Sequence, residues 1–184
     1  MENQIKRENF EVIKAKIGKH GGLDVHYTLR EVIGNDIYTN KYHVENTKEL
    51  HPDLFRAITM LSGVLANSLG YADYFKHAKS VSEEATEAVR ECYTNILMNI
   101  SVTGITYSGV GINAGVVITG TKICGENFGT TALVSPRIHY NENDDENSKR
   151  LREHLERIND EIFEFLFNDK KAQLEIFGNG ENQD

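Results

Sequence analysis

Between residues 10 and 44, lysines, arginine and histidines alternate with apolar residues, a pattern that can bind phosphate along a sheet face. Cations on one face can follow the phosphates of a single nucleic-acid strand, and rings beside them can stack on bases, at ~1–3 kcal/mol per base. The nucleic-acid-binding residues predicted here are Lys14, Lys16, His26, Arg30, Lys41, Tyr42 and His43.

Residues 100 to 140 offer a comparable set. Its outward residues are Thr106, Tyr107, Thr119, Thr121, Lys122, Arg137 and His139, and the nucleic-acid-binding residues predicted among them are Tyr107, Lys122, Arg137 and His139. The alternative for both stretches is an ordinary solvated sheet face with tyrosines packed at its edge. Asp24 and Glu31 on the first face favour that alternative, so the sequence leaves both interpretations open.

The end of the chain carries a short peptide with groove-binding chemistry. Leu174, Ile176 and Phe177 are apolar anchors, Gln173 supplies an orienting amide, and the residues beyond are polar. This peptide resembles the one by which bacterial DNA polymerases and repair proteins hold the bacterial sliding clamp. The resemblance implies a sliding clamp as partner. Alternatively, these residues form a last strand or pack under the preceding helix.

Other motifs favour a protein that is not an enzyme and needs no cofactor. The glycines of 109–115 precede a strand-like run rather than a helix, which indicates a hairpin connection and not a phosphate loop. Paired strands could bring His26 and His43 together, but no zinc-ligand spacing occurs, so we predict no metal site. The acidic residues of 142–146 are expected to cap a helix. No serine or cysteine lies in a nucleophile motif.

Composition gives the broad class. The 184 residues are 39% apolar and 26% charged, with a net charge of −8 that comes mainly from residues 141–184. Overall acidity argues against duplex binding but says little about a local groove. The two cysteines read as reduced thiols, and neither a membrane-spanning apolar run nor a signal peptide is expected. We therefore expect a cytoplasmic protein.

The periodicity predicts an α+β fold. Strand-like runs at 10–19, 23–33 and 37–44 precede a helix from Pro52 to Leu69, and runs at 100–107, 115–123 and 130–140 precede a helix over 146–168. We interpret these as two β-β-β-α units, antiparallel sheets with helices on one face, from an internal duplication. The predicted segments are 1–70, a helical connection at 71–99, 100–169, and a peptide tail at 170–184. Exposed strand edges favour a homo-oligomer.

Two resemblances concern larger parts of the chain. The repeated sheet-then-helix order is similar in topology to Whirly-type single-strand binders, and to sliding clamps in permuted order. The segments 102–106, 115–122 and 172–177 resemble uncharacterised small proteins of tailed bacteriophages, which occur with replication or recombination genes. That resemblance implies a role in DNA metabolism inside a bacterial host cell.

The leading hypothesis is a phage-like accessory protein of replication or recombination. It binds single-stranded DNA and recruits, or competes for, the host sliding clamp. The alternative is an inhibitor of host anti-phage defence that sequesters a nucleotide signal or binds a defence protein. A third interpretation is a structural or assembly protein with a large defined oligomer.

Overall fold

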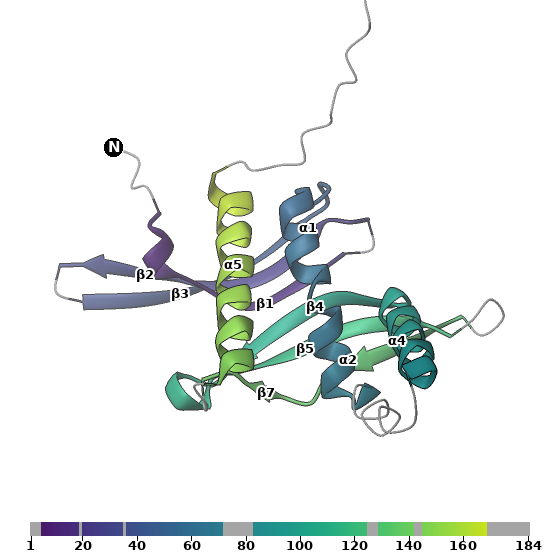
Figure 1. Cartoon of the computed structure of the whole chain (residues 1–184). Helices are drawn as coiled ribbons and strands as arrows, with labels where there is room; N and C mark the ends of the chain where they lie inside the picture. Colours follow the sequence, from purple (N-terminus) through teal and green to yellow (C-terminus); the bar gives the residue numbers. More distant parts are fainter. Residues whose placement is uncertain are drawn as a thin grey trace, which may run out of the picture.

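The fold is built on one antiparallel sheet. The computed structural model describes residues 5–18, 20–34, 36–71, 83–124, 129–141 and 145–168. The sheet has seven strands in the order β3-β2-β1-β4-β5-β6, and β7 pairs with β5 (Figure 1). The predicted α+β class is confirmed. The separate sheets expected for two units are instead joined through β1 and β4, and the internal duplication stays a prediction.

The first half begins with a three-stranded meander. Its elements are η1 (Arg7–Asn9), β1 (Phe10–Ile17), β2 (Leu23–Ile33) and β3 (Asp36–Asn46). Alternating apolar residues put one side of β1 and β2 into the core. The β2–β3 ladder runs without a shift from Leu23↔Asn46 to Ile33↔Asp36, so this hairpin is long and regular.

The expected helix over 52–69 forms as two shorter ones. They are α1 (Pro52–Thr59) and α2 (Ser62–Ser68), separated at Met60 and Leu61. Pro52 occupies the first turn, and the His51 ring accepts the Asp53 backbone N–H at 3.2 Å. Gly70 has a φ of 81°, as expected for the residue that ends the helical segment.

The second half repeats the strand order with one additional strand. Its elements are α4 (Glu83–Met98), β4 (Ile100–Ser108), η3 (Gly111–Asn113), β5 (Gly115–Ile123), β6 (Thr130–Val134), β7 (Ile138–His139) and α5 (Glu146–Phe167). The strand expected over 130–140 is interrupted because Ser135 turns into the core. Its N–H donates to the Ile118 carbonyl, and its Oγ accepts the Ile118 N–H, both at 2.9 Å.

The core lies between the sheet and the helices, which share one face of the sheet (Figure 1). Three of the described helices cross to the other meander: α1 and α2 contact β4, and α5 contacts β1 and lies beside α1. The helix α4 contacts β4, the next strand along the chain. The predicted apolar stripe of α5 is buried, and Phe163 is buried with it against Phe10, with ring centroids 5.5 Å apart. The aromatic residues outside the stripe therefore widen the buried face of α5.

Gly104 permits the junction between the two meanders. β1 and β4 pair only over Lys14–Lys16 and Gly104–Thr106. A Cβ on Gly104 would lie 2.8 Å from the Ala15 carbonyl oxygen and 3.3 Å from the Lys16 Cα, which are both backbone atoms. Because backbone atoms in a paired strand cannot move away freely, any side chain at this position pushes the junction apart.

We predict that Gly104→Ala lowers the free energy of unfolding by ~1–3 kcal/mol through overpacking. Gly63→Ala is the matched control, because Gly63 lies in α2 and a Cβ there meets no heavy atom within 4 Å. Alanine in that helix should leave stability unchanged or raise it by up to ~1 kcal/mol. Urea unfolding of both variants measures the difference. Equal stability of the two would show that the junction tolerates a side chain.

Candidate nucleic-acid interface

The sheet face opposite the helices collects most of the predicted cationic residues of the first meander. The cross-strand pairs Lys14↔His26 and His26↔His43 place three of them in one row across β1, β2 and β3. Side chains two positions apart on a strand share a face. Lys16, Arg30 and Lys41 therefore project on the same side. The residues between them on β1 and β2, such as Val25 and Leu29, point into the core.

The row continues onto the second meander as hydroxyl groups. Lys14 also pairs with Thr106 on β4, and Thr106 pairs with Val117 on β5. Thr119 and Thr121 follow on the same face of β5, and the Thr119 hydroxyl donates to the Gly104 carbonyl at 3.2 Å. The sequence had indicated these three threonines as outward residues, from their alternation with apolar residues.

A wide groove of about 1020 Å³ lies beside the β1–β4 junction. Its lining combines two lysines, two acids, a histidine and several hydroxyls, and α1 contributes Phe55 and Thr59 to the same groove. The polar lining residues are Lys14, Lys16, His20, Asp24, Glu45, Ser101, Thr103, Thr106, Thr119 and Thr121. Such a lining offers cations for phosphate and hydroxyls for sugar or base edges.

Ion pairing leaves part of the positive charge available. Arg30 pairs with Glu11 at 3.4 Å, and both side chains are more than half exposed, so this pair holds little energy. Among the described residues, no carboxylate lies within ion-pair distance of Lys14, Lys16 or Lys41. These three lysines are therefore the cations that an anionic ligand would meet.

The tyrosines expected beside these lysines lie on the other face. The Tyr42 ring stacks on the Tyr27 ring, with centroids 5.3 Å apart, on the helix side of the sheet. The Tyr107 hydroxyl donates to the Leu155 carbonyl of α5 at 3.4 Å, and burial raises the pKa of Tyr107. The structure therefore does not bring Tyr42 or Tyr107 together with the lysines, and the expected interleaving of cations and tyrosines is not met.

The other three predicted residues do not join the lysines: Lys122 lies on the helix side, Arg137 is bound by a turn, and His139 pairs with Gly115 at the start of β5. The Lys122 ammonium lies over the Tyr71 ring, 4.7 Å from its centroid, on the helix side. The Arg137 guanidinium donates to the carbonyls of Ser108 and Asn113, so it fastens the β4–β5 turn. That turn leads through η3 into a strand, as expected for a hairpin connection.

The predicted clamp-binding residues Gln173, Leu174, Ile176 and Phe177 lie outside the residues that the structure describes. The acidic segment before α5 is described in part. Asp145 caps that helix, because its side chain accepts the N–H groups of Asn147 and Ser148. The hydrogen bond from the Ser148 hydroxyl, together with these backbone hydrogen bonds, lowers the pKa of Asp145. The capping role predicted from the sequence is confirmed for this residue.

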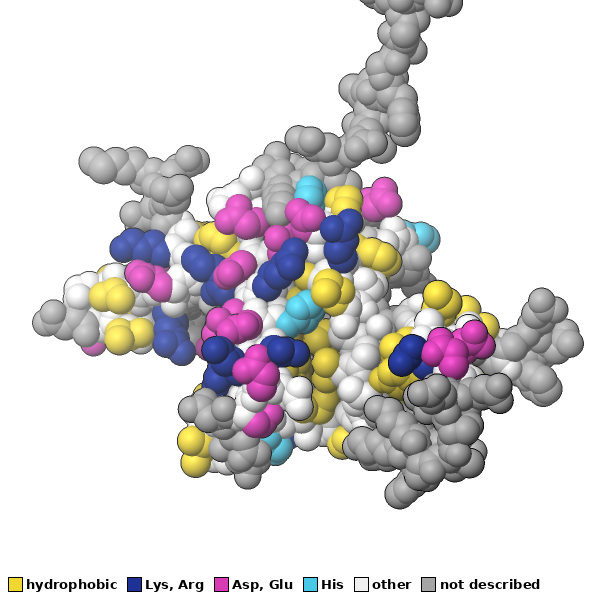
Figure 2. Space-filling view, viewed as in Figure 1, with side chains coloured by type: hydrophobic (Ala, Val, Ile, Leu, Met, Phe, Trp, Pro, Cys, Tyr) yellow, Lys and Arg dark blue, Asp and Glu magenta, His cyan; other side chains and the backbone are white. Residues whose placement is uncertain are grey.

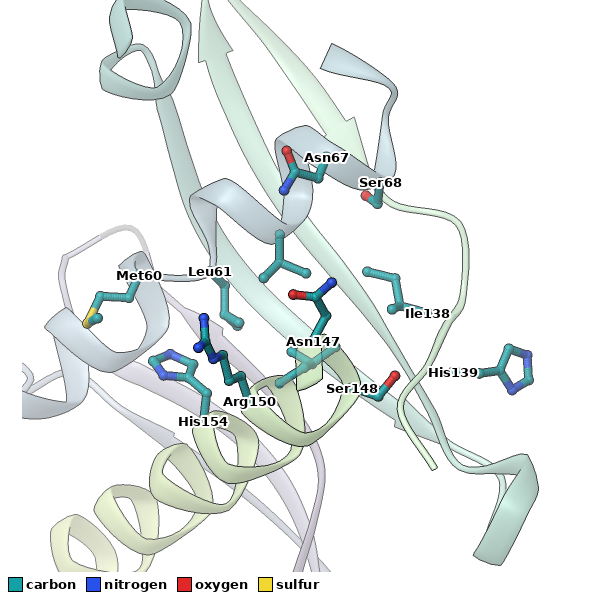
Figure 3. A pocket seen from close by; sticks show the side chains of 12 residues that line it. Met60, Leu61, Asn67, Ser68, Ile138, His139, Asn147, Ser148, Arg150 and His154 are labelled. Atoms are coloured by element: carbon teal, nitrogen blue, oxygen red, sulfur yellow. The ribbon is translucent and has the colours of Figure 1, made fainter. Parts of the chain in front are cut away.

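A second cavity of about 580 Å³ lies between the α1–α2 segment, the first half of α5 and β7 (Figure 3). Leu61, Val64 and Leu151 give it an apolar lining, and its polar groups are largely engaged. Arg150 pairs with Glu146 at 3.0 Å, and the His154 ring donates to the Ala57 carbonyl at 2.7 Å. Figure 3 shows the His139 side chain pointing away from the other labelled residues.

Two further observations complete the description. None of the described helices is long and apolar enough to cross a membrane. Comparisons with protein-family models, with curated proteins and with solved structures find no match to this chain.

Proposed function

We propose that the open sheet face binds single-stranded DNA. The observation that carries this proposal is the gathering of Lys14, Lys16 and Lys41, with His26 and His43, on one uncovered face beside a hydroxyl-lined groove. Lys14 and Lys16 are two residues apart on β1, about 7 Å along the strand. That separation suits successive phosphates of an extended single strand, and the threonines of β4 and β5 extend the path across the sheet.

The arrangement favours a particular mode of binding. Because the tyrosines lie on the helix side, base stacking adds little, and the interaction is mainly electrostatic and tolerant of sequence. The described charges of the helix side are mixed in sign. Figure 2 shows Lys and Arg interspersed with Asp and Glu on that side, and the net charge of the chain is −8.

We predict that Lys14→Ala/Lys16→Ala weakens single-strand binding several-fold and reduces the slope of log affinity against log salt by about 1.4, which is about 0.7 per lost phosphate contact. Lys149→Ala/Arg150→Ala removes the same charge from α5 on the helix side and is the matched control. Fluorescence anisotropy of a labelled single strand, with a duplex for comparison, measures both variants.

The outcomes separate this function from its main alternative. Equal loss in both double variants, or no strand binding by the native chain, would contradict the proposal. The alternative is an inhibitor of host defence that sequesters a nucleotide signal, and the volume of the groove is sufficient for a nucleotide. It requires a rise in melting temperature with a cyclic or linear dinucleotide, without salt-dependent strand binding.

We also propose that the chain is a phage-like replication or recombination accessory protein in the host cytoplasm. In this proposal it is not an enzyme, and it contacts the bacterial sliding clamp through Gln173–Phe177. The support is the sequence Gln-Leu-Glu-Ile-Phe at 173–177, followed by a polar segment. An extended peptide of this type binds by inserting alternate apolar side chains into pockets, so its contribution does not depend on the sheet.

We expect deletion of residues 172–184 to abolish binding to a purified bacterial sliding clamp. Deletion of residues 178–184 removes only the polar end and should preserve clamp binding. Biolayer interferometry with immobilised clamp measures both. Neither deletion should affect the Lys14- and Lys16-dependent binding of single strands. If both truncated chains bind the clamp like the full chain, another part of the protein makes the contact, or the peptide interpretation is wrong.

We propose further that the chain forms a homo-oligomer through the β2–β3 hairpin. β3 is an edge strand, and Val32, Ile37 and Tyr38 near the end of the hairpin are 67%, 71% and 48% exposed. A long edge with exposed apolar side chains is open to pairing with a second copy.

Light scattering should give a mass for the native chain above the 20.8 kDa monomer, and Ile37→Lys should reduce it to that of the monomer. Val110→Lys introduces the same charge at a residue that is 79% exposed in the β4–β5 turn, and should leave the mass unchanged. A monomeric native chain would contradict this assignment of the hairpin.

A further inference from the structure

Three metal-ligating side chains meet on the open face of the β2–β3 hairpin. Asp24 and His26 are two residues apart on β2, so they share a face, and His43 is the direct cross-strand partner of His26. The two imidazole rings lie parallel, with centroids 4.1 Å apart and an interplanar angle of 4°. One Asp24 carboxylate oxygen lies 2.9 Å from His43 Nε2 and 3.8 Å from His26 Nε2.

These distances between side-chain atoms match the distances between ligand atoms bound to one metal ion. Nitrogen and oxygen ligands at about 2.0–2.2 Å from a common zinc ion lie roughly 3–4 Å from one another. One ligand atom from each of the three residues falls within 4.8 Å of the others, so small side-chain rotations bring all of them to a shared ion. The His26 and Asp24 side chains are 40% and 28% exposed, so the cluster is supported by the sheet and still reachable from solvent.

We propose that Asp24, His26 and His43 bind a divalent first-row transition metal ion of the Zn²⁺ or Co²⁺ type. Two imidazoles and one carboxylate favour such ions over Mg²⁺ and Ca²⁺, which prefer all-oxygen ligands. Three ligands on an open face leave coordination positions for water or an exogenous anion. Lys14, the cross-strand partner of His26 on the other side, would favour an anion there. This inference does not depend on binding of single-stranded DNA.

The second cluster of this kind among the described residues is less suitable. It consists of His51, Asp53 and Glu161. The His51 nitrogen that faces Asp53 already accepts the Asp53 backbone N–H at 3.2 Å as the cap of α1. A metal ion on that nitrogen would remove the cap, whereas the ligands on the β2–β3 hairpin lose only a hydrogen bond between side chains.

Titration of the full chain with Co²⁺, followed by visible absorption, and with Zn²⁺, followed by calorimetry, tests the proposal without nucleic acid. We expect uptake of one ion per chain. His26→Gln and His43→Gln should each weaken it at least about tenfold, because each removes a direct ligand. His139→Gln and His51→Gln serve as controls and should bind like the native chain. Circular dichroism of each variant confirms that the exposed substitutions leave the fold intact.

Specific results would contradict the proposed metal site. No uptake by the native chain would mean that Asp24 and His43 form only a hydrogen-bonded pair, and the proposal would fail. It would also fail if His51→Gln removed uptake while His26→Gln did not. Cys92 and Cys124 are exposed thiols. An intense near-ultraviolet thiolate-to-cobalt band that disappears in Cys92→Ser/Cys124→Ser would assign the ion to them instead.

Discussion

The short pairing between β1 and β4 is the constraint on which the rest of the structure depends. Only Lys14–Lys16 and Gly104–Thr106 join the two meanders, yet this junction turns them into one sheet. It also sets where the helices go. Because α1 and α2 contact β4 of the second meander and α5 contacts β1 of the first, these three helices pack across the junction. Neither meander therefore completes its core alone.

One-sided coverage by helices accounts for the candidate site. A sheet whose described helices all lie on one face presents polar side chains on the other, because none of those helices shields them from water. At the junction, the open face brings Lys14 and Lys16 of the first meander next to the threonines of the second. The groove is thus a direct result of joining two half-sheets, and it includes residues from both halves of the sequence.

The alternation of residues predicted the first meander well and the second less well, for a physical reason. In 23–29, every second residue is apolar and buried, so the faces of His26 and Arg30 could be read directly. In β4, a register shift between Val102 and Gly104 reverses the alternation, and this shift turns Tyr107 toward α5. A bulge of this kind is set by cross-strand pairing and leaves no clear pattern in a single strand.

Other residues could not be placed because their surroundings come from distant parts of the chain. β3 is exposed along most of its length, so it has no apolar alternation from which the face of Tyr42 could be read. Lys122 lies near the end of β5 on the core side of the sheet, where its ammonium reaches the ring of Tyr71, a residue that follows α2. The Arg137 guanidinium donates hydrogen bonds to backbone carbonyls of a turn more than twenty residues earlier in the chain. The sequence shows the chemical type of each residue, but it does not show which distant group that residue contacts.

The distribution of charge explains how an acidic chain can present a site for anions. The carboxylates that give the net charge of −8 are concentrated after residue 140, in α5 and beyond, and α5 lies on the covered side of the sheet. At physiological ionic strength, exposed charges are largely screened beyond about 8 Å. In the proposed binding mode, a phosphate on the open face would therefore interact mainly with the charges near it, which are Lys14, Lys16 and Lys41 and the groove acids Asp24 and Glu45, and only weakly with α5 behind the sheet. The local surface, rather than the net charge of the chain, decides what binds there.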